Sequence, residues 1–148
     1  MRVVSGTQRL TVVTLGVRDF RASLRFYEAL GFERKVRATG DEVAFFDAGG
    51  VVLALWHWKL LAEDEALPAE PVSAYRGMSL AWNCKTAEEV DSAFASAIAA
   101  GAKPLRNPGK TDYGGYRGYF ADPDGHAWEV VTAPGFDFTE DGRLILPD

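Results

Sequence analysis

The chain has one cysteine, Cys84, among its 148 residues. A single cysteine excludes an intrachain disulfide, and it also excludes any zinc or redox motif that needs paired cysteines. We therefore expect Cys84 to be a small residue of the hydrophobic core.

Long apolar runs and basic stripes are absent as well. No stretch approaches the about 18 to 20 consecutive apolar residues that a membrane span needs, and the segment "MRVVSGTQRL" has no apolar core of a signal peptide. The net charge of −5 is spread along the chain, so neither a membrane nor a nucleic acid is an expected partner. With 47% hydrophobic and 25% charged residues, the sequence predicts one globular domain, 1–148, in the cytoplasm.

Two stretches of the chain repeat one pattern. "LGVRDFRASLRFYEALGFERK" and "WNCKTAEEVDSAFASAIAAGAK" each contain a short apolar strand, a basic residue, an amphipathic helix and a glycine stop. Asp19 is the expected N-cap of the first helix, which ends before Gly31. Thr86 and Glu89 form a capping-box pattern in the second helix, which ends before Gly101.

Each repeat is followed by a β-rich segment. "DEVAFFDAGGVVLALWHW" predicts a hairpin that turns at Gly49 and Gly50, and "YRGYFADPDGHAWEVV" predicts another that turns at 123–125. The organisation is therefore βα followed by about three antiparallel strands, twice. We place module one at about 8–60, a connector with one short helix at about 61–76, module two at about 77–135 and a C-terminal tail at 136–148, where a turn precedes a short apolar strand.

This duplicated pattern, the "FYEALGF" end of the first helix and the motif "GYFADPDGHAWEVV" resemble the vicinal oxygen chelate superfamily, which includes glyoxalase I, bleomycin-resistance proteins and extradiol dioxygenases. The resemblance covers about Leu10 to Ala133. It implies an α+β fold in which two βαβββ modules form curved mixed sheets around a cavity, usually in a homodimer. Within the superfamily, this chain looks like a glyoxalase-like branch that lacks most of the metal ligands.

Enzymes of this superfamily hold a divalent metal with four side chains, one in the first and one in the last strand of each module. By that resemblance the four positions fall on Val12, Ala54, Ser79 and Glu129. Val12 and Ala54 have no donor atoms, and a serine hydroxyl is a poor ligand beside imidazole or carboxylate. The sequence therefore predicts no bound metal and no other cofactor.

The two histidines do not restore the metal site. His126 and Glu129 are three residues apart, so on a strand their side chains point to opposite faces of the sheet. We expect His126 to fix the turn or to lie on the outer face. We expect His57, at a strand end between two tryptophans, to have a structural or pocket role.

Glu129 itself has two open readings. It is a carboxylate satisfied locally by Ser79, Thr14 or a tyrosine hydroxyl, or it is a group that orients a ligand or acts as a general base.

Further candidates for a ligand pocket follow from strand alternation and from aromatic content. Thr14, Ala81 and Asn83 share the cavity side with Val12 and Ser79, whereas Leu15, Trp82 and Cys84 are expected beneath the helices. Trp56 and Trp58 have the parity of Ala54 and could form a wall, although tryptophans there could equally belong to the core or to a dimer interface.

The glycine-rich stretch "NPGKTDYGGYRGY" is predicted to be a loop that carries Tyr113, Tyr116 and Tyr119. Our ligand-binding set comprises Val12, Thr14, Ala54, Trp56, Ser79, Ala81, Tyr113, Tyr116 and Glu129.

Three functions fit these residues. The first is a binding protein whose metal-free cavity holds a small, partly apolar or aromatic molecule, and this is the function we predict. The second is a metal-dependent lyase or dioxygenase, which requires ligands that the matching positions lack. The third is a metal-independent enzyme that uses Glu129 with a tyrosine.

Overall fold

The computed structural model describes residues 8–148 of the chain. Residues 1–7 lie outside the described residues. They include most of the segment 1–10, in which the sequence predicts no signal peptide. Among the described residues, no helix has the length and apolar character to cross a membrane.

The first half of the chain forms one mixed sheet. It consists of β1 (Val12–Val17), helix α1 (Phe20–Ala29), β2 (Glu33–Lys35), the short 3-10 helix η1 (Arg37–Thr39), β3 (Val43–Asp47) and β4 (Val52–His57). The strand order is β1-β4-β3-β2, with β1 parallel to β4 and the other pairs antiparallel. Helix α2 (Trp58–Asp64) follows β4 directly.

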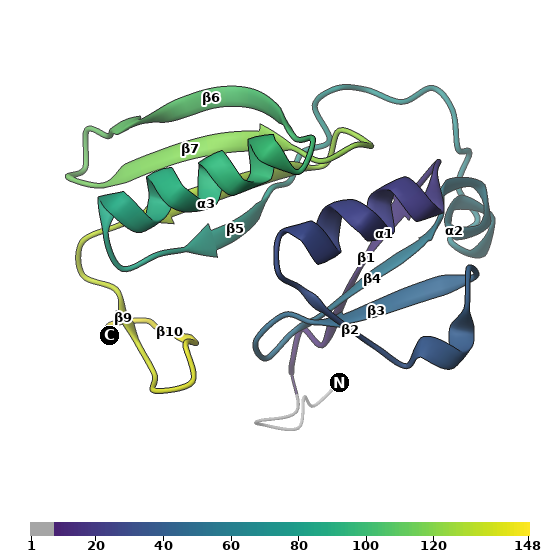
Figure 1. The fold of residues 1–148 in the computed structure, drawn as a ribbon, viewed down its shortest axis with the longest axis horizontal. Coiled ribbons are helices and arrows are strands. Elements are labelled where there is room, and N and C mark those ends of the chain that lie inside the picture. Colours follow the sequence, from purple (N-terminus) through teal and green to yellow (C-terminus); the bar gives the residue numbers. More distant parts are fainter. Residues whose placement is uncertain (1–7) are drawn as a thin grey trace, which may run out of the picture.

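The second half repeats this topology. It contains β5 (Leu80–Asn83), helix α3 (Ala87–Ala99), β6 (Lys103–Lys110), β7 (Tyr116–Ala121) and β8 (Ala127–Thr132) in the order β5-β8-β7-β6. A small hairpin of β9 (Asp137–Phe138) and β10 (Leu144–Ile145) ends the chain. The two sheets lie side by side, each with its own helix (Figure 1). The predicted α+β fold of two βαβββ modules is confirmed.

Local sequence signals set the helix ends. The Asp19 carboxylate accepts a hydrogen bond from the Ala22 amide, and the Thr86 hydroxyl accepts one from the Glu89 amide. Gly31 and Gly101 follow the two C-caps with φ angles of 99° and 109°, a conformation that glycine adopts without the strain a side chain would add. The predicted caps and stops are confirmed.

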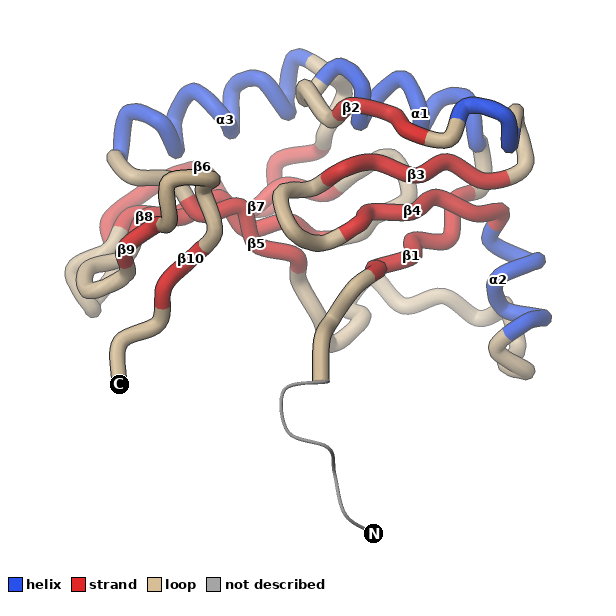
Figure 2. The backbone as a smooth tube through the Cα atoms, turned by 90° about the horizontal axis from the view of Figure 1, so that it is seen from below, coloured by secondary structure: helices blue, strands red, loops and turns tan. Residues whose placement is uncertain are grey.

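Both long helices cover the same side of the two sheets, as Figure 2 shows. The residues of β1, β4, β7 and β8 that face α1 and α3 form one core, which includes Leu15, Leu55, Phe120 and Val130. Cys84 is buried in this core as predicted. The alternate residues of each strand therefore face away from α1 and α3, and we call this side of the two sheets the open face.

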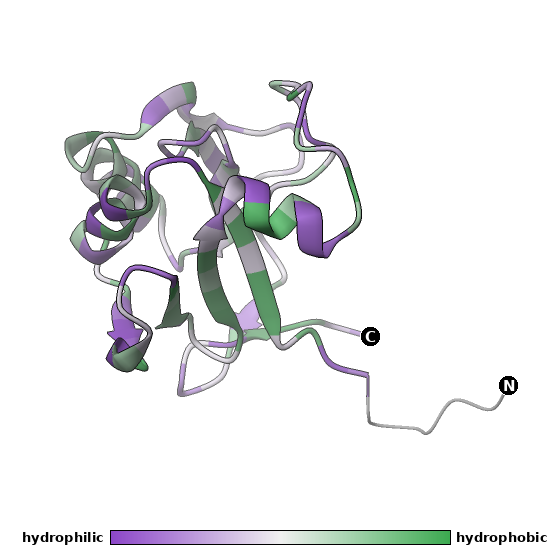
Figure 3. Ribbon diagram, turned by 90° about the vertical axis from the view of Figure 1, so that its right-hand side faces the viewer, coloured by the Kyte–Doolittle hydropathy of each residue, from purple (hydrophilic) through white to green (hydrophobic). Residues whose placement is uncertain are grey.

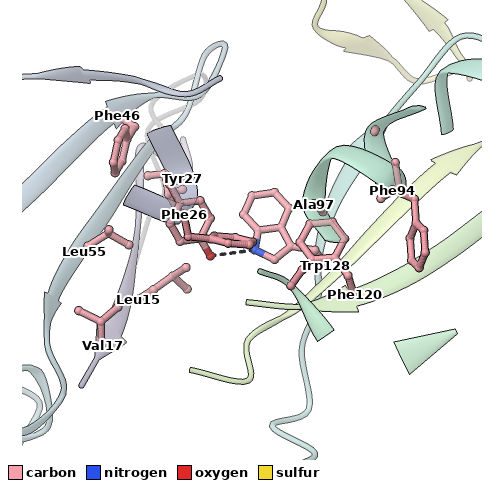
Figure 4. Packing of buried hydrophobic residues seen from close by; sticks show 14 of the residues in the cluster. Leu15, Val17, Phe26, Tyr27, Phe46, Leu55, Phe94, Ala97, Phe120 and Trp128 are labelled. Atoms are coloured by element: carbon pink, nitrogen blue, oxygen red, sulfur yellow. Dashed lines mark hydrogen bonds between the residues drawn. The ribbon is translucent and has the colours of Figure 1, made fainter. Parts of the chain in front are cut away.

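A buried polar network joins the two halves inside this core. The Tyr27 hydroxyl on α1 donates to the Asp122 carboxylate at 2.6 Å and accepts from the Trp128 indole N–H at 3.0 Å. Tyr27 and Trp128 point toward each other between the helices (Figure 4). Burial, followed by the negative charge of Asp122, raises the pKa of Tyr27 well above its ordinary value, so the hydroxyl keeps the proton that it donates.

Two local predictions were wrong. Trp58 does not continue β4 but begins α2, with His57 as the N-cap, so it does not share the strand parity of Ala54. The stretch 107–110, predicted as loop, forms the end of β6. Strand β6 is an edge strand with two register irregularities, and an edge strand tolerates Pro108 because one side of its backbone has no partner.

Replacing Tyr27 with phenylalanine tests the polar network. Tyr27→Phe leaves the Asp122 carboxylate and the Trp128 N–H buried without this partner, so we expect the free energy of unfolding to fall by about 2–3 kcal/mol. Urea unfolding measures the change. The matched control is Tyr116→Phe, which removes a hydroxyl bonded to the exposed Asp91 at 2.6 Å and should cost less than about 1 kcal/mol. Equal losses for the two variants would contradict a special role for the buried network.

Candidate functional site

The open faces of the two modules correspond position by position. In the first sheet Thr14 of β1 pairs with Ala54 of β4, and in the second Ala81 of β5 pairs with Glu129 of β8. Both pairs join the parallel first and last strands of a module. Ala54 is therefore the structural counterpart of Glu129, so the first module carries a methyl group where the second carries a carboxylate.

The residues at the four metal positions do not fit a metal ion. Val12 lies on β1 with 43% of its surface exposed, Ala54 is buried and Ser79 is exposed just before β5. Only Glu129 carries an anionic oxygen, and one carboxylate with a serine hydroxyl is a weak donor set for a divalent cation. Within residues 8–148 no group of three or more His, Cys, Asp or Glu side chains is placed to hold a metal.

Glu129 is paired with a tyrosine on the neighbouring strand. Tyr119 of β7 lies directly opposite Glu129 in the antiparallel register, and its hydroxyl donates to Glu129 Oε2 at 2.8 Å. Burial, and then the bond to Glu129, raises the pKa of Tyr119. The prediction that a tyrosine hydroxyl satisfies Glu129 is confirmed, which leaves open whether a ligand shares the carboxylate.

Tyr119 was missing from our ligand-binding set, although the sequence contained a signal for it. A turn at 123–125 in "YRGYFADPDGHAWEVV" places Tyr119 opposite Glu129 by simple counting outward from the hairpin.

Two further residues lie near this pair. Arg117 is two residues before Tyr119 on the same face of β7, and its positive charge lowers the pKa of Tyr119, against the larger effects that raise it. Tyr113, with 58% of its surface exposed, lies in the turn between β6 and β7, and it raises the Tyr119 pKa slightly. The open face of the second sheet therefore combines a carboxylate, a phenol and a guanidinium.

Tyr116 does not belong to this group. Its ring packs against the core on the helix side, and its hydroxyl donates to Asp91 of α3. Our set placed it in the pocket because the whole stretch 107–119 was expected to be a loop. Once β7 begins at Tyr116, alternation directs Tyr116 and Tyr119 to opposite faces of the sheet.

The open face of the first sheet is apolar and partly covered by α2. Trp56 of β4 is half-buried beside Gly16 of β1. A Cβ on Gly16 would lie 3.3 Å from Cε3 of Trp58 and 3.4 Å from its Cα, so the absence of a side chain allows α2 to pack closely on β1. Figure 3 shows α2 in front of these strands, with apolar and polar residues interspersed along it.

A cavity of about 550 Å³ lies between α2, the connector and the junction of the two sheets. Such a volume is within the range of small-molecule sites. Its lining is mainly apolar and includes Thr14, Leu61, Met78, Leu80, Leu105 and Ala127. Ala127 lines the cavity and lies two residues before Glu129 on the same face of β8. The cavity wall at Ala127 is therefore about 7 Å from the Glu129 backbone, measured along the strand.

The two histidines have structural positions. The His126 amide donates to the Asp122 carboxylate, and its Nε2 lies 2.8 Å from the Gly16 carbonyl oxygen, as expected for a residue that fixes the turn. His57 Nε2 lies 3.2 Å from the Asp41 carbonyl oxygen, and its ring packs against Phe20.

Cys84 is not available as a ligand either. Burial raises the pKa of its thiol to about 11, whereas the thiolate is the form that binds metals and attacks electrophiles.

Comparisons with known proteins agree with this architecture. The family model described as the Glyoxalase/Bleomycin resistance protein/Dioxygenase superfamily matches residues 9–130. No curated protein sequence matches the chain.

Solved structures also match the chain. A glyoxalase-related enzyme from Fulvimarina pelagi is 36% identical with a TM-score of 0.84, over 95% of this chain and 99% of that one. A glyoxalase/bleomycin resistance protein/dioxygenase from Nocardioides is 29% identical with a TM-score of 0.71, over 90% and 89%. Lactoylglutathione lyase from Agrobacterium tumefaciens shares the fold at 21% identity, with a TM-score of 0.65 over 86% and 96%. The chain therefore belongs to the glyoxalase/bleomycin resistance protein/dioxygenase superfamily.

Proposed function

We propose that the protein binds a small, partly apolar or aromatic molecule on the open face, in a cavity that uses no metal ion. The observation that carries this proposal is that two of the four metal positions, Val12 and Ala54, are apolar, while Thr14, which pairs with Ala54, lines a cavity of about 550 Å³. Val12 and Ala54 have no donor atoms for a metal, and the half-buried Trp56 adds an aromatic surface. The ligand gains most of its affinity from burial of its apolar surface.

The pair of Glu129 and Tyr119 orients such a ligand. Tyr119 donates to Oε2 of Glu129, so Oε1 can accept a hydrogen bond from a hydroxyl or N–H of the ligand. A hydrogen bond to a charged acceptor contributes about 1.5–3 kcal/mol. Thr14 lines the cavity, Ala81 pairs with Glu129 on the neighbouring strand, and Tyr113 lies in the turn that precedes β7.

The same hydrogen bond favours a second candidate, a metal-independent enzyme. A carboxylate beside an apolar cavity can accept a proton from a bound substrate as a general base. In this reaction Oε1 of Glu129 would take the proton while the Tyr119 hydroxyl remains bonded to Oε2. The metal-dependent lyase or dioxygenase has less support, because two of the four positions have no donor atom and a third has only a serine hydroxyl.

We also propose a homodimer in which a second copy covers the exposed apolar surface of the first sheet around Val12, outside the cavity. Val12 and Val36 are exposed on or beside the first sheet, and the apolar surface extends to Phe45. Burial of these side chains against a second copy would remove apolar surface from water.

Light scattering at micromolar concentrations measures the dimer. We expect twice the chain mass of 16.2 kDa, and Val12→Lys should shift the protein toward monomer, because a charge would be buried in the interface. The matched control is Leu146→Lys, at an exposed apolar residue of the tail, and it should leave the mass unchanged. A monomeric parent protein at all concentrations would contradict the dimer.

Thermal unfolding tests the metal-free cavity. We expect chelator-treated protein to show the same Tm with and without nickel, zinc, manganese or ferrous ions. A metal at about 100 times its Kd would add about 2.7 kcal/mol, which raises Tm by about 5–11 °C for a chain of this length. A rise of that size that disappears in Glu129→Gln would overturn the proposal and restore a metalloprotein.

Binding of 2-naphthol, compared with 2-methoxynaphthalene, tests the role of Glu129. The hydroxyl of 2-naphthol can donate to Glu129, so Glu129→Gln should weaken its binding about tenfold or more and leave the methoxy compound unaffected. Calorimetric titration measures both. Glu28→Gln, the same change on the exposed side of α1, is the control. Equal affinities of the parent protein for the two compounds would contradict a hydrogen-bonding role.

A further inference from the structure

Arg76, in the connector, lines the cavity at the junction of the two sheets. Its guanidinium donates to two carbonyl oxygens, from Nε to Ser73 at 2.9 Å and from Nη2 to Asp124 at 2.8 Å. Its Nη1 lies 3.1 Å from Nδ1 of His126. Two of these partners are backbone carbonyl oxygens and the third is an imidazole nitrogen, so none is a carboxylate. Among residues 8–148, the ion pairs of the structure do not include Arg76.

The surroundings hold this guanidinium in one place. His126 Nε2 is bonded to the Gly16 carbonyl, so Nε2 carries the proton and Nδ1 accepts from Arg76. The Arg76 guanidinium also lies 5.1 Å from the ring centre of Trp58. A Cβ on Gly125 would lie 3.1 Å from Nη2 of Arg76, so the glycine leaves room for the side chain.

The fixed guanidinium still has hydrogen-bonding capacity. A guanidinium has five N–H groups, and the three contacts use one on each nitrogen, which leaves one N–H on Nη1 and one on Nη2. A positive charge fixed by neutral partners, beside an apolar cavity, attracts an anion more strongly than a solvated surface arginine does.

The remainder of the cavity wall suits a hydrophobic body. Trp58, Leu61 and Leu105 line it. At its rim Leu67 and Tyr75 are 61% and 83% exposed, which is apolar surface that a ligand would remove from water. The lining includes one carboxylate, that of Glu65, which is exposed at the end of α2.

We propose that this cavity binds a small hydrophobic carboxylate, with the carboxylate at Arg76 and the apolar body against Trp58 and the leucines. The inference rests on the proposed function and names the class of ligand that the cavity takes. Charge complementarity selects the carboxylate, because the Arg76 guanidinium is held in place and has no counter-ion within residues 8–148. A planar carboxylate can accept from both free N–H groups. The carboxylate of Glu65 opposes this ligand through charge repulsion, so its removal should strengthen binding.

Calorimetric titration with naphthalene-2-carboxylate and its uncharged methyl ester tests the proposal. We expect the carboxylate to bind about ten- to a hundredfold more tightly than the ester. Arg76→Gln should remove that preference, Arg76→Lys should retain part of it, and Glu65→Gln should strengthen binding of the carboxylate. Arg25→Gln, the same charge change on the exposed side of α1, should leave both affinities unchanged. Ala74→Trp, at the exposed edge of the cavity, should weaken binding of both compounds.

The outcomes separate this inference from the proposed function. If both compounds bind equally and Arg76→Gln has no effect on either, the anion site is wrong although the cavity binds ligands. If the carboxylate preference is lost in Glu129→Gln but kept in Arg76→Gln, the ligand lies at the other end of the open face and the inference is overturned. The third outcome is that neither compound binds and that Ala74→Trp changes the particle mass measured by light scattering. A second copy of the chain then covers the cavity, and both proposals fail for this site.

Discussion

The turn between β7 and β8 is the point at which the two modules are fixed to each other. The buried Asp122 carboxylate accepts from the Tyr27 hydroxyl of α1, and its other oxygen accepts from the amides of Asp124 and His126 in its own turn. Asp124 then accepts from the Arg18 amide at 2.9 Å, and the His126 ring bonds to Gly16. A buried carboxylate without these donors would be strongly destabilising, so the turn is held in one geometry relative to α1 and β1.

The site depends on this arrangement because its walls come from both modules. Gly16 and Thr14 belong to the first sheet, while Leu80 and Ala127 belong to the second. Helix α2 packs closely on β1 at Gly16, which has no side chain, and Arg76 is held at the cavity by His126 and the Asp124 carbonyl of the β7–β8 turn. The motif that resembles the superfamily signature therefore contributes to the cavity through Gly125, His126 and Ala127.

Glu129 shows how a carboxylate is kept on a mostly apolar face. By the family resemblance its position corresponds to that of a metal ligand, yet its partner here is the phenol of Tyr119 and the nearby charge is that of Arg117. The corresponding position of the first module is filled by the methyl group of Ala54. The open face thus has one polar half and one apolar half, an asymmetry that suits a ligand with one polar edge.

The sequence by itself determined the parts of the molecule that depend on neighbours along the chain. The helix caps at Asp19 and Thr86, the glycine stops, the two hairpin turns and the alternation that buries Leu15 and Cys84 are local consequences of side-chain chemistry and strand geometry. The sequence predicted a short helix after the first module, but tertiary packing decided that α2 begins at Trp58, against Gly16. Tertiary packing also decided the end of β6 and the face on which Tyr116 lies, through the pairing of β6 with β7. The contacts of Tyr27 with Asp122 and of Arg76 with His126 span 95 and 50 residues, and no local rule links such distant positions; only the packing of one module against the other brings them together.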